Sequence, residues 1–278
     1  MVPEGNPASD ELTDWSDQID TIAGPTSCPS SGFAPGGCGQ RRSGEAGVAT
    51  GDRQALVKAL LDRIDKAHGA PGSRLPGERL LASSFGASRA SVREVLGVLE
   101  VLRVIERRPQ SGIYLHPALA EASLEALVLR EALDVRSPIA AYEQAQEARV
   151  IHEVEAVRLA AKRRTAADLE AMRAAIDRSR ASQRRGANLA DDDETFHLAL
   201  IAAAKNPILS RIAKSLYLIT RTVRRAYFQM PGTAPASIEE HERILESVAR
   251  RDSTRAVKQL RRHYAGSSAR WQKAYAAL

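Results

Sequence analysis

The fold of the first part of the chain is decided by the stretch Ser73-Arg74-Leu75-Pro76-Gly77-Glu78-Arg79-Leu80-Leu81-Ala82 and, soon after it, Ala87-Ser88-Arg89-Ala90-Ser91-Val92-Arg93-Glu94-Val95-Leu96. Pro76 presets the backbone for a short helix that runs through Phe85 and ends at Gly86. Ser88 is placed to cap a further helix, whose apolar stripe consists of Val92, Val95, Leu96, Leu99 and Leu102. The stretch therefore predicts two consecutive short helices.

Elements on both sides of these helices complete a small domain. Before them, Gly69–Gly72 stops an earlier helix, whose apolar residues recur at helical spacing as Leu56, Val57, Leu60, Leu61 and Ile64. After them, Val104-Ile105 and Ile113-Tyr114-Leu115 flank Pro109-Gln110-Ser111-Gly112, which predicts a β-hairpin. Three helices and a hairpin predict a winged helix-turn-helix over residues 51–117.

The third helix carries the residues that predict a DNA contact. Arg89 and Arg93 are four positions apart, so they share one face near the helix N-terminus, which enters the major groove in a helix-turn-helix. Arginine can bind guanine bidentately or clamp a phosphate, and serine can donate to either. A glycine at the hairpin tip lets the backbone approach the minor groove. The predicted DNA-binding set is Arg79, Ser88, Arg89, Ser91, Arg93 and Gly112; the alternative is that the arginines are only a solvated helix face.

Beyond Pro117 the strand pattern disappears. Helical periodicity predicts segments at about 121–134, 140–164, 166–185, 190–205, 208–229, 238–250 and 253–277. Several residues are expected to begin or end these helices. They are helix caps at Thr165 and Asp252, a helix end at Asn206-Pro207, a loop at Pro231–Pro235, and a capping box at Ser237-Ile238-Glu239-Glu240. Amphipathic helices with short loops predict an antiparallel bundle over residues 118–278. The fold class is therefore mainly α.

Composition narrows the class of protein. The chain of 278 residues is 44% hydrophobic, and no apolar run approaches the roughly 20 residues that span a bilayer. The N-terminus is acidic and lacks the basic, apolar pattern of a signal peptide, so we expect a cytoplasmic protein with no membrane partner. The net charge of +6 permits a polyanionic partner.

Residues 1–50 differ from the rest. They hold two Arg against seven Asp and Glu, with 8 Gly and 5 Pro and almost no apolar periodicity. This composition predicts a disordered tail, although a start of translation assigned too early would explain it equally well. Cys28 and Cys38, which lie in this segment, match no common zinc spacing and are interpreted as reduced thiols.

Three histidines of the helical region are candidate metal ligands. Asp193 and His197 are four positions apart and share one helix face. His241 and His263 come from two later helices, so three imidazoles and one carboxylate can close around a divalent metal in the bundle core. Helical histidines are more often surface or core residues, and spacing alone leaves that alternative open.

The first domain resembles the DNA-binding domain of the GntR family of bacterial regulators over residues 52–116. The resemblance rests on the Arg-Leu-Pro-x-Glu-Arg-x-Leu-Ala pattern around Arg79, on Ser-Arg-x-Ser-Val-Arg-Glu around Arg93, and on the glycine of the wing. It implies that Arg79, Arg89, Arg93 and Gly112 carry the DNA contacts. One departure is Arg103-Val104-Ile105, where the family usually has Gly-Leu followed by Val or Ile.

Residues 120–275 resemble the FCD domain, the effector-binding bundle of FadR-like GntR regulators. The resemblance rests on Arg149-x-x-x-Glu153, Asp193-x-x-Phe196-His197, Asn206-Pro207, Glu240-His241 and the Asp252…His263 helix. It implies metal ligation by Asp193, His197, His241 and His263, with zinc, nickel or manganese as the ion. It also implies that Arg149 holds the carboxylate of a small organic acid and that Asn206 lines the same cavity. We interpret Glu153 as an i,i+4 partner of Arg149 and assign no role to His152.

These observations predict a homodimeric transcription regulator, most simply a repressor, that binds operator DNA and responds to a small carboxylate. It is not expected to be an enzyme, because four protein ligands leave little room for an activated water and no further general base is evident. The alternatives are a regulator that senses the metal itself and a metal-dependent hydrolase. Operator release by metal alone would favour the first, and turnover by the purified protein would favour the second.

Overall fold

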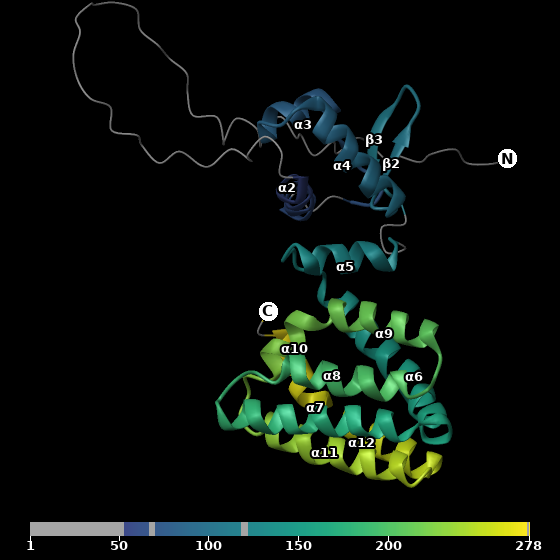
Figure 1. Ribbon diagram of the computed structural model, residues 1–278. Coiled ribbons are helices and arrows are strands. Elements are labelled where there is room, and N and C mark those ends of the chain that lie inside the picture. The colour runs from purple at the N-terminus through teal and green to yellow at the C-terminus, as the bar shows by residue number, and fades with distance from the viewer. Residues whose placement is uncertain (1–52, 67–69, 118–121, 277) are drawn as a thin grey trace, which may run out of the picture. The chain divides into compact units, whose positions relative to one another are not determined.

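The computed structural model describes residues 53–66, 70–117, 122–276 and 278 (Figure 1). The expected tail at residues 1–50, with Cys28 and Cys38, lies outside them. The chain divides into two compact units. The N-terminal unit runs to Val101 and resumes at Ile105, and the helical unit comprises Leu102–Val104 and the described residues from 122 onward. Within the described residues, no helix combines the length and apolar character that a membrane crossing requires.

The N-terminal unit contains the three predicted helices. They are α2 (Arg53–Lys66), α3 (Glu78–Phe85) and α4 (Arg89–Val101). The apolar stripe predicted for α2 is entirely buried, as are four of the five residues predicted for the stripe of α4. The helix starts and stops also follow the sequence, because Gly86 ends α3 in the left-handed conformation and the Ser88 hydroxyl accepts the backbone N–H of Ser91.

A three-stranded antiparallel sheet completes this unit. Strands β2 (Ile105–Arg108) and β3 (Gly112–Leu115) form the predicted hairpin, and β1 (Arg74–Leu75) pairs with the other edge of β3. The sequence did not predict β1, because two residues are too few to show strand alternation. In the register Arg74 lies opposite Tyr114, and Arg108 lies opposite Gly112. Gly112 therefore begins β3 instead of standing at the hairpin tip.

The helical unit consists of α5 (Leu124–Ala132), α6 (Ile139–Arg163), α7 (Ala166–Arg184), α8 (Ala190–Ala202), α9 (Pro207–Ile219), α10 (Arg221–Tyr227), α11 (Thr233–Ala249) and α12 (Ser253–Ala276). Figure 1 shows these helices packed side by side, and α6 contacts α8, α9, α11 and α12. The mainly α fold class predicted from the sequence is confirmed. The central position of α6 matters for the site, because its buried polar residues face several neighbouring helices at once.

Two boundaries within this unit differ from the prediction. The expected helix at 208–229 is divided at Thr220, whose hydroxyl donates to the carbonyl of Leu216 at 2.9 Å, a bond that bends helices. The predicted loop at Pro231–Pro235 and capping box at Ser237 are wrong, because α11 begins at Thr233 directly after the left-handed Gly232. A proline is tolerated in the first helical turn, where no N–H partner is needed. Ser237 consequently lies inside the helix and is buried.

The other helix caps lie where the sequence predicted them. Thr165 caps α7 through a capping box with Asp168, and Asp252 accepts the N–H of Arg255 at the start of α12. Asn206 not only follows α8 but also begins α9, since its side-chain oxygen accepts the N–H groups of Ile208 and Leu209.

Candidate functional sites

The N-terminal ends of α3 and α4 present five of the six residues predicted to contact DNA: Arg79, Ser88, Arg89, Ser91 and Arg93. Arg79 and Arg89 are exposed, and Arg93 joins them on the solvent side. The Ser88 hydroxyl is occupied by contacts within the same helix turn. It accepts the backbone N–H of Ser91 at 3.0 Å and hydrogen-bonds the hydroxyl of Ser91 at 2.9 Å. The two serines thus fix the beginning of the helix that carries the arginines.

Arg93 of α4 forms an ion pair with Glu78, the first residue of α3. Its Nε and Nη2 donate to the carboxylate of Glu78 at 3.2 and 2.9 Å. This hydrogen bond is the main cause that lowers the pKa of Glu78, and it raises the pKa of Arg93. The Arg93 side chain is still 62% exposed, so it is oriented by Glu78 while its remaining N–H groups face water.

The wing has a specific requirement for glycine. Gly112 has φ +132°, and a Cβ added there would lie 3.1 Å from Nε of Arg74. A side chain would be strained by the backbone conformation and crowded by the guanidinium that crosses it. Arg74 and Arg108, whose guanidinium lies 4.3 Å from the centre of the Tyr114 ring, are basic wing residues that the sequence pattern did not single out.

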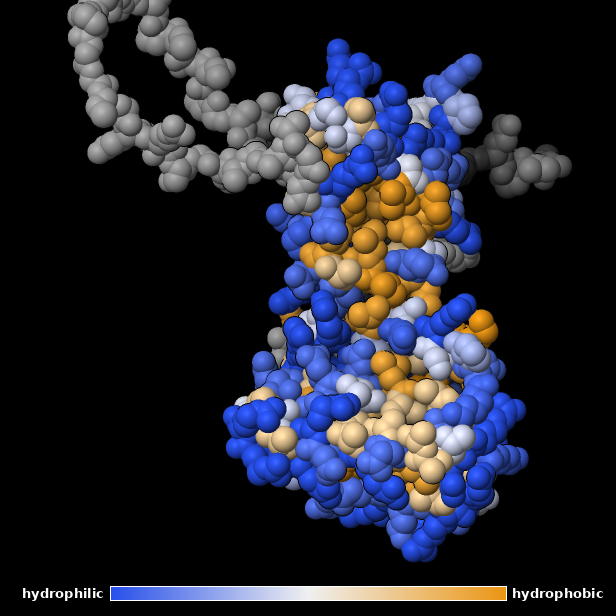
Figure 2. All heavy atoms as spheres, in the orientation of Figure 1, coloured by the Kyte–Doolittle hydropathy of each residue, from blue (hydrophilic) through white to orange (hydrophobic). Residues whose placement is uncertain are grey.

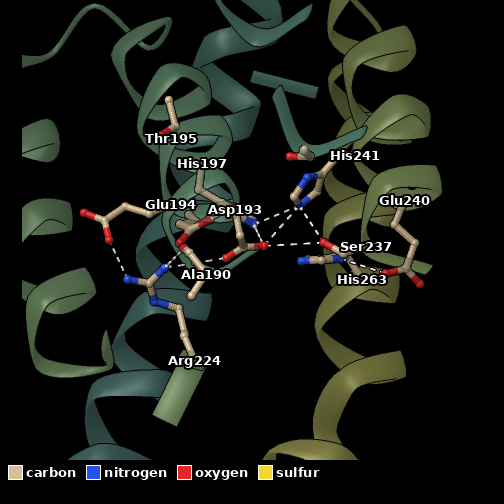
Figure 3. A network of polar contacts seen from close by, with 12 residues as sticks. Ala190, Asp193, Glu194, Thr195, His197, Arg224, Ser237, Glu240, His241 and His263 are labelled. Atoms are coloured by element: carbon tan, nitrogen blue, oxygen red, sulfur yellow. Dashed lines mark hydrogen bonds and ion pairs between the residues drawn. The ribbon is translucent and has the colours of Figure 1, made fainter. Parts of the chain in front are cut away.

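The four predicted metal ligands come together inside the helical unit. Their candidate donor atoms all lie within 4.8 Å of one another, and all four residues are buried: Asp193, His197, His241 and His263. Figure 3 shows them converging from α8, α11 and α12. His241 Nε2 lies 3.2 Å from His197 Nε2 and 3.5 Å from Asp193 Oδ1.

Two carboxylates, the buried Glu153 and the half-buried Glu240, orient two of these imidazoles. Glu153 Oε2 lies 2.7 Å from Nδ1 of His197, and Glu240 Oε2 lies 2.7 Å from Nδ1 of His263. A carboxylate at that distance accepts the Nδ1 proton, which leaves Nε2 as a bare acceptor. Burial opposes ionisation of Glu153, but His197, Arg149 and Tyr217 outweigh it and hold the pKa of Glu153 well below its usual range.

This arrangement fits a divalent metal. Imidazole nitrogens and a carboxylate oxygen point at one another, all within 4.8 Å, so one cation can be bound by all four residues. Burial, and then the neighbouring His197 and His263, hold the pKa of His241 well below its usual value, so that its ring stays neutral and able to ligate. Three nitrogens and one oxygen suit zinc, nickel or manganese.

Arg224 supports the carboxylate of this cluster. It is 1% exposed, and it donates to the carbonyl of Ala190, to the carboxylate of Glu194 and to the carbonyl of Tyr217. Its Nη1 lies 3.9 Å from Oδ2 of Asp193, while Oδ1 faces the imidazoles (Figure 3). The guanidinium thus compensates the charge of the oxygen that points away from the histidines.

Arg149 lies beside the cluster. It is 2% exposed, its guanidinium carbon lies 3.8 Å from the centre of the Tyr217 ring, and its Nε lies 3.6 Å from Glu153 Oε1. It donates to Gln146 at 3.0 Å, but only at 3.4 Å to the hydroxyls of Thr220 and Tyr264. These last two bonds are long and their acceptors are neutral hydroxyls, so a carboxylate could replace them.

A small inner cavity joins these residues. It has a volume of about 20 Å³ and is lined by Arg149, Asp193, His197, His263 and residues around them, including Ser237, Tyr264 and Trp271. That volume is close to the space that one water molecule needs. Asn206 is not among its lining residues, because its side chain caps α9. An effector-binding role for Asn206 therefore stays a prediction that the cavity does not support.

Sequence reasoning missed several residues of this cavity and of the polar contacts around the metal-ligand cluster. Ser237 was interpreted as a helix cap, yet its hydroxyl lies 3.4 Å from both Asp193 Oδ1 and His241 Nε2. Glu153 was interpreted only as a partner of Arg149, whereas it also orients His197. No sequence motif marks Tyr217, Tyr264 or Arg224 as part of the site. They reach the cluster only because α9, α10 and α12 pack around it. His152 has no part in the cluster.

Comparisons with known proteins identify both units. Residues 53–115 match the family model described as "Bacterial regulatory proteins, gntR family", and residues 144–266 match the FCD domain. The HTH-type transcriptional regulator LutR of Bacillus subtilis is 33% identical over 187 residues, which cover 64% of this chain and 82% of LutR. The chain belongs to the GntR family.

Other similarities agree with this assignment. The galactonate operon transcriptional repressor of Escherichia coli is 26% identical over 187 residues, which cover 67% of this chain and 82% of that protein. The solved structure described as "Lar controls the expression of the Listeria monocytogenes agr system and mediates virulence" is 21% identical, with a TM-score of 0.60 over 80% of this chain and 97% of that chain, and therefore shares the fold. As a GntR-family protein with an FCD domain, the chain is a DNA-binding transcription regulator and, as the sequence predicted, not an enzyme.

Proposed function

We propose that this GntR regulator is a repressor whose operator binding is controlled by a small carboxylate held beside a divalent metal. The observation that carries the proposal is the convergence of three buried imidazoles and one carboxylate. Glu153 and Glu240 orient two of these imidazoles, and the buried Arg149 lies beside them with two long hydrogen bonds that a carboxylate could replace. Similar proteins that are repressors, such as the galactonate operon transcriptional repressor of Escherichia coli, support the sign of regulation.

On the DNA side, Arg89 and Arg93 of α4 are proposed to enter the major groove, with Arg79 and the wing residue Gly112 beside them. Glu78 fixes the direction of the Arg93 side chain before DNA arrives, which lowers the entropy lost on binding. Two copies of the N-terminal unit would contact two half-sites, so we expect a palindromic operator.

A homodimer is supported by apolar side chains on the outside of the helical unit. Ile151 on α6 and Ile208 and Ile212 on α9 are 64%, 56% and 39% exposed, and these two helices pack against each other. Figure 2 shows apolar atoms between the hydrophilic ones on the visible face of this unit. A second copy of the chain is the partner that would cover such residues in a symmetric regulator.

On the effector side, Asp193, His197, His241 and His263 would hold the metal. A bound divalent ion supplies net positive charge and a coordination position for an oxygen of the acid. Arg149 supplies the second charge, by exchanging its long bonds to Thr220 and Tyr264 for charge-assisted bonds to the carboxylate. Binding would regulate DNA affinity only if the acid favours one of two arrangements of the protein.

The direct test is an operator titration in a gel-shift assay with protein first loaded with zinc. Candidate small carboxylates should release the operator from the wild type. They should have no effect on His263→Ala, which still binds the operator but lacks a metal ligand. Operator affinity that no carboxylate changes would contradict the proposal.

A second candidate, metal sensing, is favoured by one observation, the volume of about 20 Å³ of the inner cavity. A cavity of this size holds the ion and a water molecule, and an organic acid needs more room. The same titration separates the two candidates, because a metal sensor should release or bind the operator when zinc alone is added to metal-free protein.

A further inference from the structure

A second cavity lies next to the inner one. It has a volume of about 250 Å³ and lies between α6 and α12, where it is lined by Glu143, Gln146, Glu147, Val150, Tyr264, Trp271, Gln272 and Tyr275. Tyr264 and Trp271 line both cavities. These two side chains therefore form a shared wall between the inner and the outer cavity, and Gln146 of the outer cavity is a hydrogen-bond partner of Arg149.

The volumes indicate where the body of a bound acid would lie. The inner cavity has space for little more than one water molecule. Any acid that reaches the metal ligands and Arg149 with its carboxylate must therefore place its remaining atoms elsewhere. The outer cavity, beyond Tyr264 and Trp271, is the adjoining space that can receive them.

The charge of the outer cavity is negative. Glu143 and Glu147 are one helical turn apart on α6 and exposed, and neither makes a hydrogen bond or ion pair with a residue that the structure describes. None of the described residues that line the cavity is basic. Burial, together with the charge of Glu143, raises the pKa of Tyr275 to about 12, and the charge of Arg149 partly opposes this shift.

The wall itself is aromatic. The rings of Trp271 and Tyr275 lie 5.9 Å apart with an angle of 53° between their planes, and Tyr264 adds a third ring. Aromatic faces attract cations, and indole does so most strongly. Two unpaired carboxylates that line the same cavity as these aromatic rings are thus suited to an ammonium or another organic cation, and they repel a second carboxylate.

We propose that the effector has a carboxylate at one end and a positively charged group at the other, with the cation in the outer cavity between Glu143, Glu147 and Trp271. This proposal rests on the proposed function, because it assumes that the carboxylate end reaches Arg149 and the metal ligands. It names the ligand class of that site: a zwitterionic acid binds, and a dicarboxylate of the same length is rejected.

Three acids with the same five-carbon chain test the proposal: 5-aminopentanoate, pentanoate and glutarate. They end in an ammonium, a methyl group and a second carboxylate. Calorimetric titration of the full-length, zinc-loaded protein should give the order 5-aminopentanoate, then pentanoate, then glutarate. The ammonium should bind at least about fivefold more tightly than the methyl group, the factor expected for a cation beside an aromatic face.

The matched variants are Glu143→Gln with Glu147→Gln, and Glu155→Gln as a control on the same helix. Glu155 is exposed and is not among the residues lining the cavity. The double variant should keep its zinc and its affinity for pentanoate, while the affinities for the other two acids move toward that value; only the part of the ammonium preference that the aromatic faces supply should remain. The control should keep the wild-type order.

Three outcomes would overturn the proposal. Glutarate that binds as tightly as 5-aminopentanoate would show that the end of the ligand opposite the metal-binding carboxylate does not lie beside Glu143 and Glu147. An order that the double variant leaves unchanged would show that another part of the protein selects the ligand. Zinc-loaded protein that binds none of the three acids would refute the carboxylate effector of the proposed function as well, which separates that failure from the first two.

Discussion

The exposed N-terminal ends of α3 and α4 and the interior of the helical unit both contain several arginines, but in opposite environments. Arg79 and Arg89 are exposed to water, whereas Arg149 and Arg224 are 2% and 1% exposed. An exposed guanidinium is hydrated in the DNA-free protein, so it changes the free energy of folding little even though it has no phosphate or base to bind. A buried one must already be paired, because an uncompensated charge in the interior is strongly destabilising. The two regions should therefore respond differently to substitution: the surface through affinity alone, and the interior through stability as well.

The largest effect is expected at Glu153, which is 1% exposed and contacts Arg149, His197 and Tyr217. Glu153→Ala leaves a buried guanidinium and an imidazole without their carboxylate. The free energy of unfolding should fall by about 3–5 kcal/mol, the cost of breaking a buried ion pair by removing one partner. Denaturant unfolding followed by circular dichroism measures this change.

The control for that experiment is Glu155→Ala, two positions further along the same helix and exposed to solvent. It should change the free energy of unfolding by no more than about 0.5 kcal/mol. Equal effects of the two substitutions would contradict the view that the interior cluster is held together by Glu153.

The next effect concerns effector affinity. Arg149→Met keeps an unbranched side chain over the Tyr217 ring but removes the charge, so the affinity for a carboxylate should fall by about 1.5–3 kcal/mol while zinc is retained. Calorimetry on zinc-loaded protein measures both. Arg163→Met, an exposed site at the other end of α6, is the matched control, and equal affinities in the two variants would exclude Arg149 from the binding site.

The contrast between the two regions also explains what the sequence could predict of the site. Asp193 and His197 share a helix face through their spacing alone. His241 and His263 were candidates from their places in two later helices, and the resemblance to the FCD domain strengthened that prediction. Ser237 was misplaced, because the boundary of α11 depends on the left-handed Gly232 and not on the capping pattern. Glu153, Tyr217 and Arg224 reach the cluster only through tertiary packing, which no local pattern encodes.

On the DNA-binding face the expected effect is smaller and leaves stability unchanged. Arg93→Ala should weaken specific operator binding by about 1–3 kcal/mol if the guanidinium contacts a base. The melting temperature should stay at the wild-type value, since the pair with Glu78 is exposed and contributes little. A gel-shift titration and a thermal melt provide the two readouts.

A second variant sharpens this test. Glu78→Gln removes the carboxylate that fixes Arg93 and should weaken operator binding by about 0.5–1 kcal/mol, because more side-chain entropy is then lost when DNA binds. Unchanged operator affinity in both Arg89→Ala and Arg93→Ala would refute the assignment of this helix face.

The smallest effect is expected at the turn after α4, where the chain departs from the GntR pattern. Arg103 has φ +58°, in the left-handed region that favours glycine. Arg103→Gly should therefore raise the free energy of unfolding by about 0.5–1 kcal/mol. Gly86→Ala, at φ +61°, should lower it by a similar amount, and a denaturant series in which both substitutions shift stability the same way would contradict this explanation.

Most of the fold was predicted from the sequence, because its helices carry long apolar stripes. The buried residues of α2 and α4 are those that the 3.6-residue period selects. What the pattern could not supply were features set by one or two residues. These are the two-residue strand β1, the bend at Thr220, and the left-handed conformation of Arg103, which only the backbone geometry shows.

The central claim is that the buried cluster of the helical unit binds a divalent metal. The most direct measurement is elemental analysis of protein purified without a histidine tag, after incubation with zinc, nickel or manganese and removal of free ions. One ion per chain is expected in the wild type, and none in His241→Ala or His263→Ala, both of which should still bind the operator. Wild-type protein that stays free of metal after all three incubations would contradict the claim, and the four residues would then be ordinary polar side chains of the bundle core.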